Sequence, residues 1–295
     1  MTPVSLYNTA CVVALEKEGL RLVSAISDRT FDARRVAAEF VKARRSAGAF
    51  DSYPGPMPPD LDAAYRCQDE AISLWDDTIA GWKVGWIPEP LSQQFGSQRL
   101  VGPIFSRSLW RANGSGRTET PVFARGFAAI EAEFVFQISK DAPVNVVDWT
   151  AETARRFVKS MYTGIEIASS PLQKINDYGP AVIASDFGNN AGLLLGAEIA
   201  DWPTRSLELL HCETRVDGAV VGQGTAAAVS GGPLAALAFA LRCNARRGRP
   251  LRAGDFVTTG ATTGVHAIAA GQTAEVVFTG IGSLRCVAVP MTPVA

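Results

Sequence analysis

The 295-residue sequence predicts an α+β protein in which an N-terminal helical layer packs on a β-rich body with mixed sheets. Apolar residues recur at helical spacing before residue 80, whereas short β-branched and aromatic runs separated by Gly, Pro, Asn and Asp dominate after it. These strands do not alternate with helices in the order of a doubly wound fold. No long polar linker divides the chain, so we expect residues 1–80 and 81–295 to belong to one structural unit.

Two helices are predicted in the N-terminal region. Asp32 can cap a helix that Gly48 ends, and its apolar residues up to Val41 lie on one face. The opposite face is expected to carry most of the basic residues Arg34, Arg35, Lys42, Arg44 and Arg45. After a segment rich in proline and glycine, a second helix is expected to begin near Asp60 and to carry apolar residues as far as Trp75.

Short apolar runs after residue 80 predict the strands of the body. They are Gly81–Trp86, Phe127–Ile138, Thr163–Ala168, Leu193–Ala197, Leu207–Val216, Phe256–Thr259, Thr273–Phe278 and Leu284–Val289. Two helices interrupt these strands: one covers Ala151–Met161 behind a Thr150 cap, and the other covers Pro233–Arg247, where Gly248 can stop it. The glycine-rich segment 218–232 lacks the spacing of a phosphate loop and is interpreted as turns and close packing.

Composition argues against several classes of protein. Hydrophobic residues make up 47% and charged residues 19% of the chain, which is typical of a globular protein and not of a disordered one. The net charge of −1 provides no positive field for nucleic acid or for an anionic membrane, so we expect neither partner. No apolar run reaches the roughly 18 residues of a transmembrane helix.

The cysteines and the first residues favour a soluble protein of the cytoplasm. Five widely spaced cysteines without a CxxC pair indicate neither a disulfide framework nor a thiolate zinc site, which fits a reducing compartment. The apolar stretch Thr9–Leu15 is followed directly by Glu16 and has no basic cluster before it, so it does not resemble a signal peptide. Only His211 and His266 could supply an imidazole, and both are interpreted as ordinary polar residues.

Two acidic residues of the predicted strand Phe127–Ile138 point to the same face. Glu131 and Glu133 are two positions apart, and alternate residues of a strand share a side. Their repulsion must be relieved by solvent, by raised pKa values or by a cation, and a hard divalent ion such as Mg²⁺ or Mn²⁺ prefers oxygen ligands. The alternative is a solvent-facing strand whose outer positions are acidic.

A third acid and a lysine raise similar questions. Glu166 lies in an apolar strand, where an unpaired buried carboxylate would be costly, so it either completes a site with Glu131 and Glu133 or pairs with a basic residue. Lys83 lies between tryptophans and glycines, where it could meet an anionic substrate or stabilise an enolate. The alternative for Lys83 is a surface lysine with its head group in water.

Five segments occur in an order that a known family shares. They are Gly81-Trp-Lys-Val-Gly85, Glu131-Ala-Glu133, Gly164-Ile-Glu166, Gly222-Gln-Gly224 and Leu251–Gly260. The ordered set covers roughly residues 30–290 and resembles the 2-keto-4-pentenoate hydratase and 4-oxalocrotonate decarboxylase family of the fumarylacetoacetate hydrolase superfamily.

The resemblance implies a β-rich catalytic fold of the fumarylacetoacetate hydrolase type. It implies a divalent metal, Mg²⁺ or Mn²⁺, held by Glu131, Glu133 and Glu166, which are the acids that the residue pattern also singles out. The family's lysine corresponds to Lys83, and the family's members generally form homo-oligomers. The resemblance therefore implies a catalytic lysine and self-association.

Three further residues are candidates for binding the substrate, namely Asp186, Asn189 and Thr263. The first two lie in a turn-forming segment, where their side chains could equally cap backbone groups. The sequence departs from the family pattern at Phe187 and Ala261, in two segments that lie near the ligand in the family. These departures leave open a relative that binds 2-oxo acids without catalysis.

The activity that the resemblance implies is hydration of an unsaturated 2-keto acid, such as 2-hydroxypenta-2,4-dienoate, in the catabolism of aromatic compounds. A 4-oxalocrotonate-type decarboxylase is the alternative with the same metal chelate. Trp82, Trp86 and Phe187 are expected to line the distal pocket with apolar surface, whereas a diacid would need a cation there, so hydration is favoured. A C–C hydrolase of 3-acylpyruvates would call for an N-terminal histidine, and none precedes His211.

Overall fold

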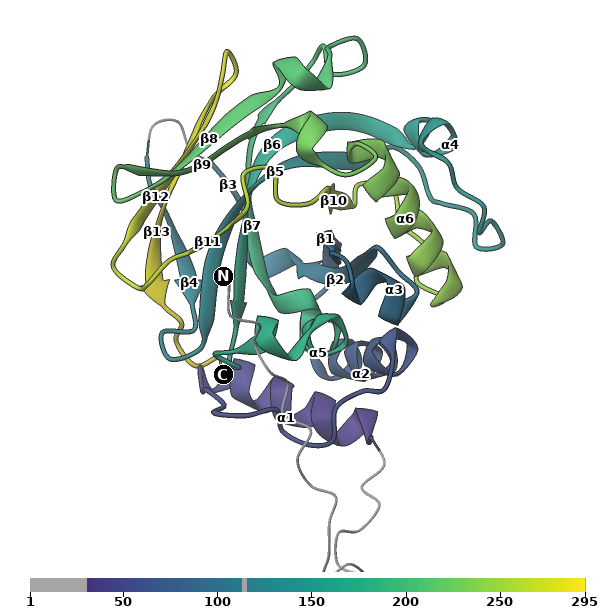
Figure 1. Cartoon of the computed structure of the whole chain (residues 1–295), viewed down its shortest axis with the longest axis vertical. Coiled ribbons are helices and arrows are strands. Elements are labelled where there is room, and N and C mark those ends of the chain that lie inside the picture. Colours follow the sequence, from purple (N-terminus) through teal and green to yellow (C-terminus); the bar gives the residue numbers. More distant parts are fainter. Residues whose placement is uncertain (1–30, 113–115, 295) are drawn as a thin grey trace, which may run out of the picture. The chain divides into compact units, whose positions relative to one another are not determined.

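Residues 31–112 and 116–294 are described in this computed structural model, and the unit that they form spans Phe31–Ala295. Two β-sheets and the helices that cover the larger one make up this unit (Figure 1). The strand-rich, mixed-sheet class expected from the sequence is confirmed. The expectations for residues 1–30, including the Thr9–Leu15 stretch, lie outside the described residues.

Helices come first in the described chain, and strands dominate after residue 78. The α-helices are α1 (Ala33–Arg45), α2 (Leu61–Leu74), α3 (Leu91–Phe95), α4 (Ala151–Arg155), α5 (Pro180–Ser185) and α6 (Pro233–Arg246). The strands are β1 (Ile79–Trp86), β2 (Arg99–Phe105), β3 (Leu109–Arg111), β4 (Thr118–Val122), β5 (Phe127–Ile138), β6 (Val158–Ser170), β7 (Asn190–Glu198), β8 (His211–Val216), β9 (Ala219–Thr225), β10 (Phe256–Thr258), β11 (Val265–Ala267), β12 (Thr273–Phe278) and β13 (Gly282–Pro290). None of these helices has both the length and the hydropathy for a membrane crossing.

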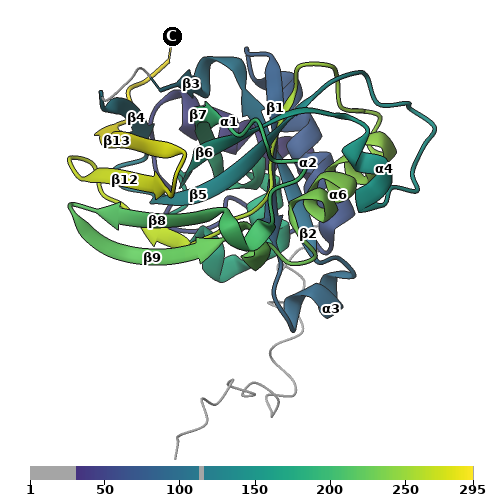
Figure 2. The same ribbon diagram turned by 90° about the horizontal axis from the view of Figure 1, so that it is seen from above.

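The larger sheet joins strands that lie far apart in the sequence. Its order is β2-β1-β10-β5-β6-β7-β3, and β11 also pairs with β5. β1 runs parallel to β10, which in turn runs antiparallel to β5, so the sheet is mixed. The smaller sheet has the order β4-β13-β12-β8-β9. In Figure 2 the larger sheet lies between this smaller sheet and the helices α2 and α6.

The first helix forms where the sequence predicts it, and its ends have clear causes. The Asp32 carboxylate accepts a hydrogen bond from the Arg35 amide at 3.0 Å, which caps the N-terminus. At the other end the left-handed residue is Ala47, with φ of 49°, and not Gly48. The Gly48 amide instead donates to the carbonyl of Ala43 at 2.8 Å, which is the 6→1 hydrogen bond of a Schellman motif.

One residue of this helix contradicts the expected division into an apolar and a basic face. Arg44 was expected among the exposed basic residues, but it is only 4% exposed. It lies on the buried side of α1 together with Phe40 and Val41. The prediction was wrong because a charged residue was assigned to solvent by its type, whereas a set of buried carbonyl and carboxylate partners compensates its burial.

The strand expected over Leu207–Val216 begins only at His211, because Leu207–Leu209 form a 3-10 helix. Two further segments differ from the prediction because of their partner strands. The helix expected over Ala151–Met161 ends at Arg155, because β6 begins at Val158 and pairs with β5 along its whole length. The segment 218–232 contains the strand β9, which pairs with β8 in an antiparallel ladder that has one irregularity, between Thr214 and Arg215. In both places the partner strand decides the structure, and local residue preference does not.

Gly102 lets a turn approach the larger sheet closely. It lies on β2 opposite Lys83 of β1. A Cβ atom at this position would lie 2.0 Å from the carbonyl oxygen of Phe187. The turn that contains Phe187 therefore rests against the sheet only because residue 102 has no side chain.

We expect the substitution Gly102→Ala to lower the free energy of unfolding by about 1–3 kcal/mol, because backbone atoms must move apart to admit the methyl group. Chemical denaturation measures this change. Gly85→Ala on the neighbouring strand is the matched control, since the nearest atom to its Cβ would lie at 3.4 Å. Equal destabilisation by the two substitutions would contradict the close-approach argument.

Candidate active site

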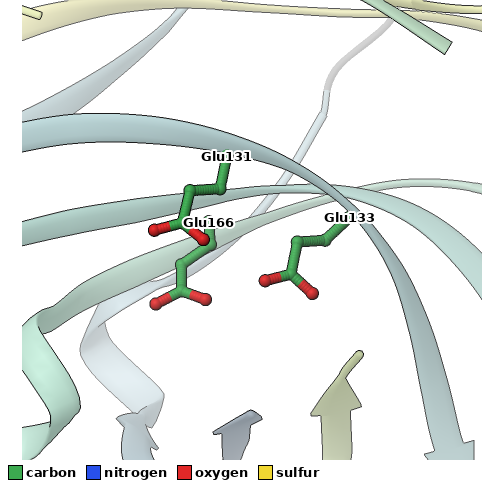
Figure 3. A group of neighbouring side chains, drawn as sticks. All are labelled: Glu131, Glu133 and Glu166. Carbon is green, nitrogen blue, oxygen red and sulfur yellow. The ribbon is translucent and has the colours of Figure 1, made fainter. Parts of the chain in front are cut away.

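Three glutamates converge on one face of the larger sheet (Figure 3). Glu131 and Glu133 project from β5 on the same side, as the strand alternation predicts, and Glu166 of β6 lies directly opposite Glu131 in the antiparallel register. Each residue offers one carboxylate oxygen, and these three oxygens lie within 4.8 Å of one another. The register thus brings together three acids that the sequence separates by up to 35 positions.

The three acids are buried, so the solvent-facing strand that was the alternative is wrong. Glu133 and Glu166 are fully buried, and Glu131 is 6% exposed. Burial is the main cause that raises the pKa of Glu131 to about 7; the charge of Lys83 opposes this rise and that of Glu166 adds to it. The pKa of Glu133 is raised well above its usual value by burial and then by Glu166 and Glu131.

Backbone amides hold one of these carboxylates in place. Glu133 Oε2 accepts hydrogen bonds from the amides of Thr259 and Gly260 at 2.7 and 2.6 Å. Its other oxygen, Oε1, is buried and has no hydrogen-bond partner. One oxygen of Glu133 is therefore fixed, while the other is available for a further interaction.

Lys83 reaches the acids from β1. Its Nζ lies 3.1 Å from Glu166 Oε1, and the residue is only 4% exposed, so it is not a surface lysine. Glu166 thus lies in the group of three acids and also pairs with a base, as the second interpretation expected. Burial lowers the pKa of Lys83, but the carboxylates of Glu166, Glu131 and Glu133 outweigh burial and raise it above its usual value. The ammonium group stays charged at neutral pH.

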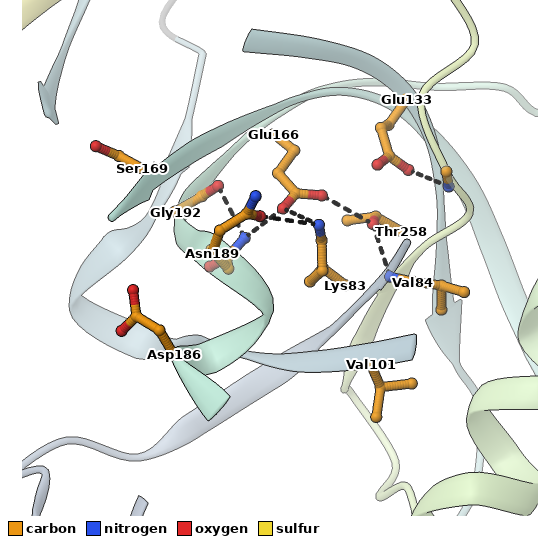
Figure 4. Close-up of polar contacts among 12 residues, drawn as sticks. Lys83, Val84, Val101, Glu133, Glu166, Ser169, Asp186, Asn189, Gly192 and Thr258 are labelled. Atoms are coloured by element: carbon orange, nitrogen blue, oxygen red, sulfur yellow. Dashed lines mark hydrogen bonds and ion pairs between the residues drawn. The ribbon is translucent and has the colours of Figure 1, made fainter. Parts of the chain in front are cut away.

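Two asparagines and a threonine complete the network around this ion pair, and Figure 4 labels Asn189 and Thr258 beside Lys83 and Glu166. Lys83 Nζ donates to Asn189 Oδ1 at 3.3 Å. Asn190 Nδ2 donates to Glu166 Oε1 at 3.1 Å, and Thr258 Oγ1 donates to Glu166 Oε2 at 3.4 Å. Sequence reasoning singled out Asn189 but neither Asn190 nor Thr258. The segment that follows Asp186 was the available signal for Asn190, and the family segment Leu251–Gly260 was the available signal for Thr258.

A cavity of about 480 Å³ opens beside these residues. Its polar lining consists of Lys83, Glu131, Asn176 and Asn189. Its apolar side chains include Trp86, Ile87, Leu91, Leu100, Ile183 and Val265. No arginine belongs to the lining, among the residues that the structure describes. The cavity therefore combines one charged end with an apolar wall.

Several expected site residues lie elsewhere. Asp186 is not part of the cavity lining and pairs with Arg44, and the Thr263 hydroxyl is hydrogen-bonded to that of Thr214 at 2.7 Å. Of the three aromatic residues expected at the distal pocket, Trp86 lines the cavity, but Trp82 and Phe187 are buried away from it. Trp82 was misplaced because adjacent positions on a strand face opposite sides. Phe187 was misplaced because its left-handed backbone turns its ring away from the cavity.

The fold and the site together define a strand-rich α+β protein with a group of three buried carboxylates. One of them, Glu131, lines a cavity together with Lys83, which pairs with a second, Glu166. The family can be stated more closely. The family model described as fumarylacetoacetate (FAA) hydrolase C-terminal matches residues 107–289, which is more than half of the chain. The chain belongs to this family.

Individual relatives agree with this assignment. A 2-keto-4-pentenoate hydratase from Paraburkholderia phymatum is 37% identical over 237 residues, which cover 77% of this chain and 85% of the relative. A 4-oxalocrotonate decarboxylase from a Pseudomonas species is 28% identical over 206 residues, which cover 69% of this chain and 76% of the relative. A solved structure, 4-oxalocrotonate decarboxylase from Pseudomonas putida G7 complexed with magnesium and adipate, has a TM-score of 0.73 at 19% identity and covers 89% of this chain and 100% of its own.

Proposed function

We propose that this protein is a metal-dependent hydratase that adds water to an unsaturated 2-oxo acid of the 2-hydroxypenta-2,4-dienoate type, in the catabolism of aromatic compounds. The observation that carries the proposal is the group of three buried carboxylates, which Lys83 contacts and which reaches an apolar-walled cavity through Glu131 and Lys83. The hydratase relative at 37% identity supports the same activity.

The residues present fit a divalent metal ion. Three buried carboxylates face a single ammonium group, and Glu133 Oε1 has no hydrogen-bond partner. A hard cation with oxygen ligands would relieve both the repulsion and the missing partner. Glu131, Glu133 and Glu166 would therefore hold Mg²⁺ or Mn²⁺. When bound, such an ion polarises a carbonyl oxygen as a Lewis acid.

The chain's own residues would bind and orient the substrate beside this site. The Lys83 ammonium supplies a fixed positive charge for the negative charge that develops on the 2-oxo oxygen as the enolate forms, and Asn189 helps to orient the ammonium through their hydrogen bond. Neither histidine lines the cavity. Val265 lines it, so the adjacent His266 points to the other side of β11. Proton transfer then falls to Lys83 and carboxyl groups and not to an imidazole.

Decarboxylation of a 4-oxalocrotonate-type diacid is the second candidate, because two relatives from Pseudomonas are named for it. Loss of CO₂ from a diacid requires that its second carboxylate be anchored, and a cation is the usual anchor. The cavity wall beyond Lys83 is apolar and carries no arginine among its described residues. This wall supports hydration of a substrate without a distal carboxylate.

We further propose that the chain forms a homo-oligomer in the cytoplasm. Self-association is the general property of the family that the sequence resembles. The cysteines that the structure describes, at positions 67, 212, 243 and 286, are all free, which supports a reducing compartment.

The proposed metal site predicts that the protein binds one Mn²⁺ ion per chain in titration calorimetry. Replacing a residue that only hydrogen-bonds to a metal ligand costs about 10–100-fold in metal affinity, so loss of a ligand by Glu131→Gln, Glu133→Gln or Glu166→Gln should cost at least as much. Glu275→Gln on the smaller sheet is the control and should leave Mn²⁺ affinity unchanged. Wild-type affinity in all three variants would refute the site.

The proposed role of Lys83 predicts that Lys83→Met lowers kcat about 100-fold or more, because the side chain keeps its bulk but loses its charge. The free energy of unfolding should fall by much less than the activation free energy of the reaction rises. Lys159→Met, at an exposed position of β6, is the control and should leave the kinetics unchanged. A Lys83→Met enzyme with normal kcat/KM would assign the residue to packing.

The apolar wall predicts hydration and not decarboxylation. Incubation with Mg²⁺ and either 2-hydroxypenta-2,4-dienoate or 4-oxalocrotonate, with hydrated product and CO₂ followed separately, should give hydration of the dienoate. Leu91→Arg places a cation in the cavity wall and should lower the inhibition constant of the diacid against dienoate hydration, whereas Leu209→Arg, at a 68% exposed position, should not. CO₂ release from the diacid without hydration of either compound would establish the decarboxylase.

A further inference from the structure

The turn between α5 and β7 has an unusual backbone. Three consecutive residues, Phe187, Gly188 and Asn189, have φ of 53°, 65° and 55°, in the left-handed region that non-glycine residues rarely adopt. At Gly188 a Cβ atom would lie 3.2 Å from Lys83 Cδ, so the turn lies directly against the lysine. Such a backbone persists where its surroundings hold it, and it often does so at functional sites.

Arg44 of α1 is the residue that holds this turn. Its Nε donates to Asp186 Oδ1 at 2.5 Å, and its Nη2 donates to the Asp186 carbonyl at 3.2 Å. Nη1 donates to the Asn190 carbonyl at 3.1 Å, and Nη2 also reaches the Ser169 carbonyl of β6 at 3.2 Å. The guanidinium carbon lies 5.0 Å from the centroid of the Phe187 ring. One buried guanidinium thus forms hydrogen bonds with Asp186 and Asn190, the residues directly before and after the left-handed run.

The residues that Arg44 fixes are those that contact the proposed active site. The Asn190 side chain donates to Glu166 Oε1, while its carbonyl is bound by Arg44. The Asn189 side chain accepts from Lys83 Nζ. Two steps of hydrogen bonding therefore lead from α1 to the Lys83–Glu166 ion pair. Figure 4 shows Asp186 at the start of this turn and Asn189 beside Lys83.

We propose that Arg44 is a positioning residue for the active site. It acts through the turn Asp186–Asn190, which keeps Asn189 on Lys83 and Asn190 on Glu166. This inference rests on the proposed function for its kinetic consequence, but its structural consequence stands independently. Only a planar fork with several donors can bind a carboxylate and three carbonyl oxygens together, so lysine is not an adequate substitute.

The test compares Arg44→Lys and Arg44→Met with Arg45→Met. Arg45 is the next residue of the same helix; it donates to the Leu74 carbonyl at 2.7 Å and has no bond to the turn. Both Arg44 variants should lower kcat at least about tenfold and weaken Mn²⁺ binding in calorimetry, because Glu166 loses its fixed neighbour. Arg45→Met should lower the unfolding midpoint without changing kcat or Mn²⁺ affinity.

A crystal structure of Arg44→Lys is the readout that does not depend on activity. It should show the turn displaced, with the Asn189–Lys83 and Asn190–Glu166 hydrogen bonds broken. Arg44→Lys retains a positive charge beside Asp186, so it keeps the test decisive where Arg44→Met does not fold. An Arg44→Lys protein with both hydrogen bonds intact, or with wild-type kcat and Mn²⁺ affinity, would reduce Arg44 to a structural tether. Wild-type protein that neither binds Mn²⁺ nor hydrates the dienoate would refute the proposed function instead. A displaced turn in the Arg44→Lys structure would still show that Arg44 positions Asp186–Asn190.

Discussion

Repulsion among three carboxylates in a buried site is the constraint on which the rest of this structure depends. Placing Glu131, Glu133 and Glu166 within 4.8 Å of one another away from water is unfavourable unless positive charge and hydrogen-bond donors surround them. The fold supplies these from separate places: Lys83 from β1 and two backbone amides from the segment after β10. The strand order β1-β10-β5 is what brings both supplies to the acids.

A good part of this site could be predicted from the sequence, because it depends on local rules. The period of two in a strand puts Glu131 and Glu133 on one side, and an acid in an apolar strand such as Glu166 requires a partner. The register that sets Glu166 opposite Glu131 could not be predicted in this way, since a shift by one residue would turn Glu166 to the other face. The resemblance to a known family supplied that missing link.

The parts that the sequence did not predict share a physical cause. Arg44 was assigned to solvent because charged residues usually lie there, and its partners are carbonyls that become available only when α1 meets β6 and the turn before β7. Phe187 was expected beside the ligand, yet its left-handed backbone turns its ring away, toward Phe105 and Trp75. Such outcomes depend on tertiary contacts, which residue type and spacing do not contain.

The segment that matches the family model is shorter than the unit that folds. The family match covers residues 107–289, whereas β1, with Lys83, and α1, with Arg44, precede it. Without β1 the short strand β10 would become an edge, and the acids would lose their only lysine partner in the described chain. Two proteins can therefore share the whole matched segment and still differ in chemistry, because the charge that balances the acids is inherited with a different part of the chain.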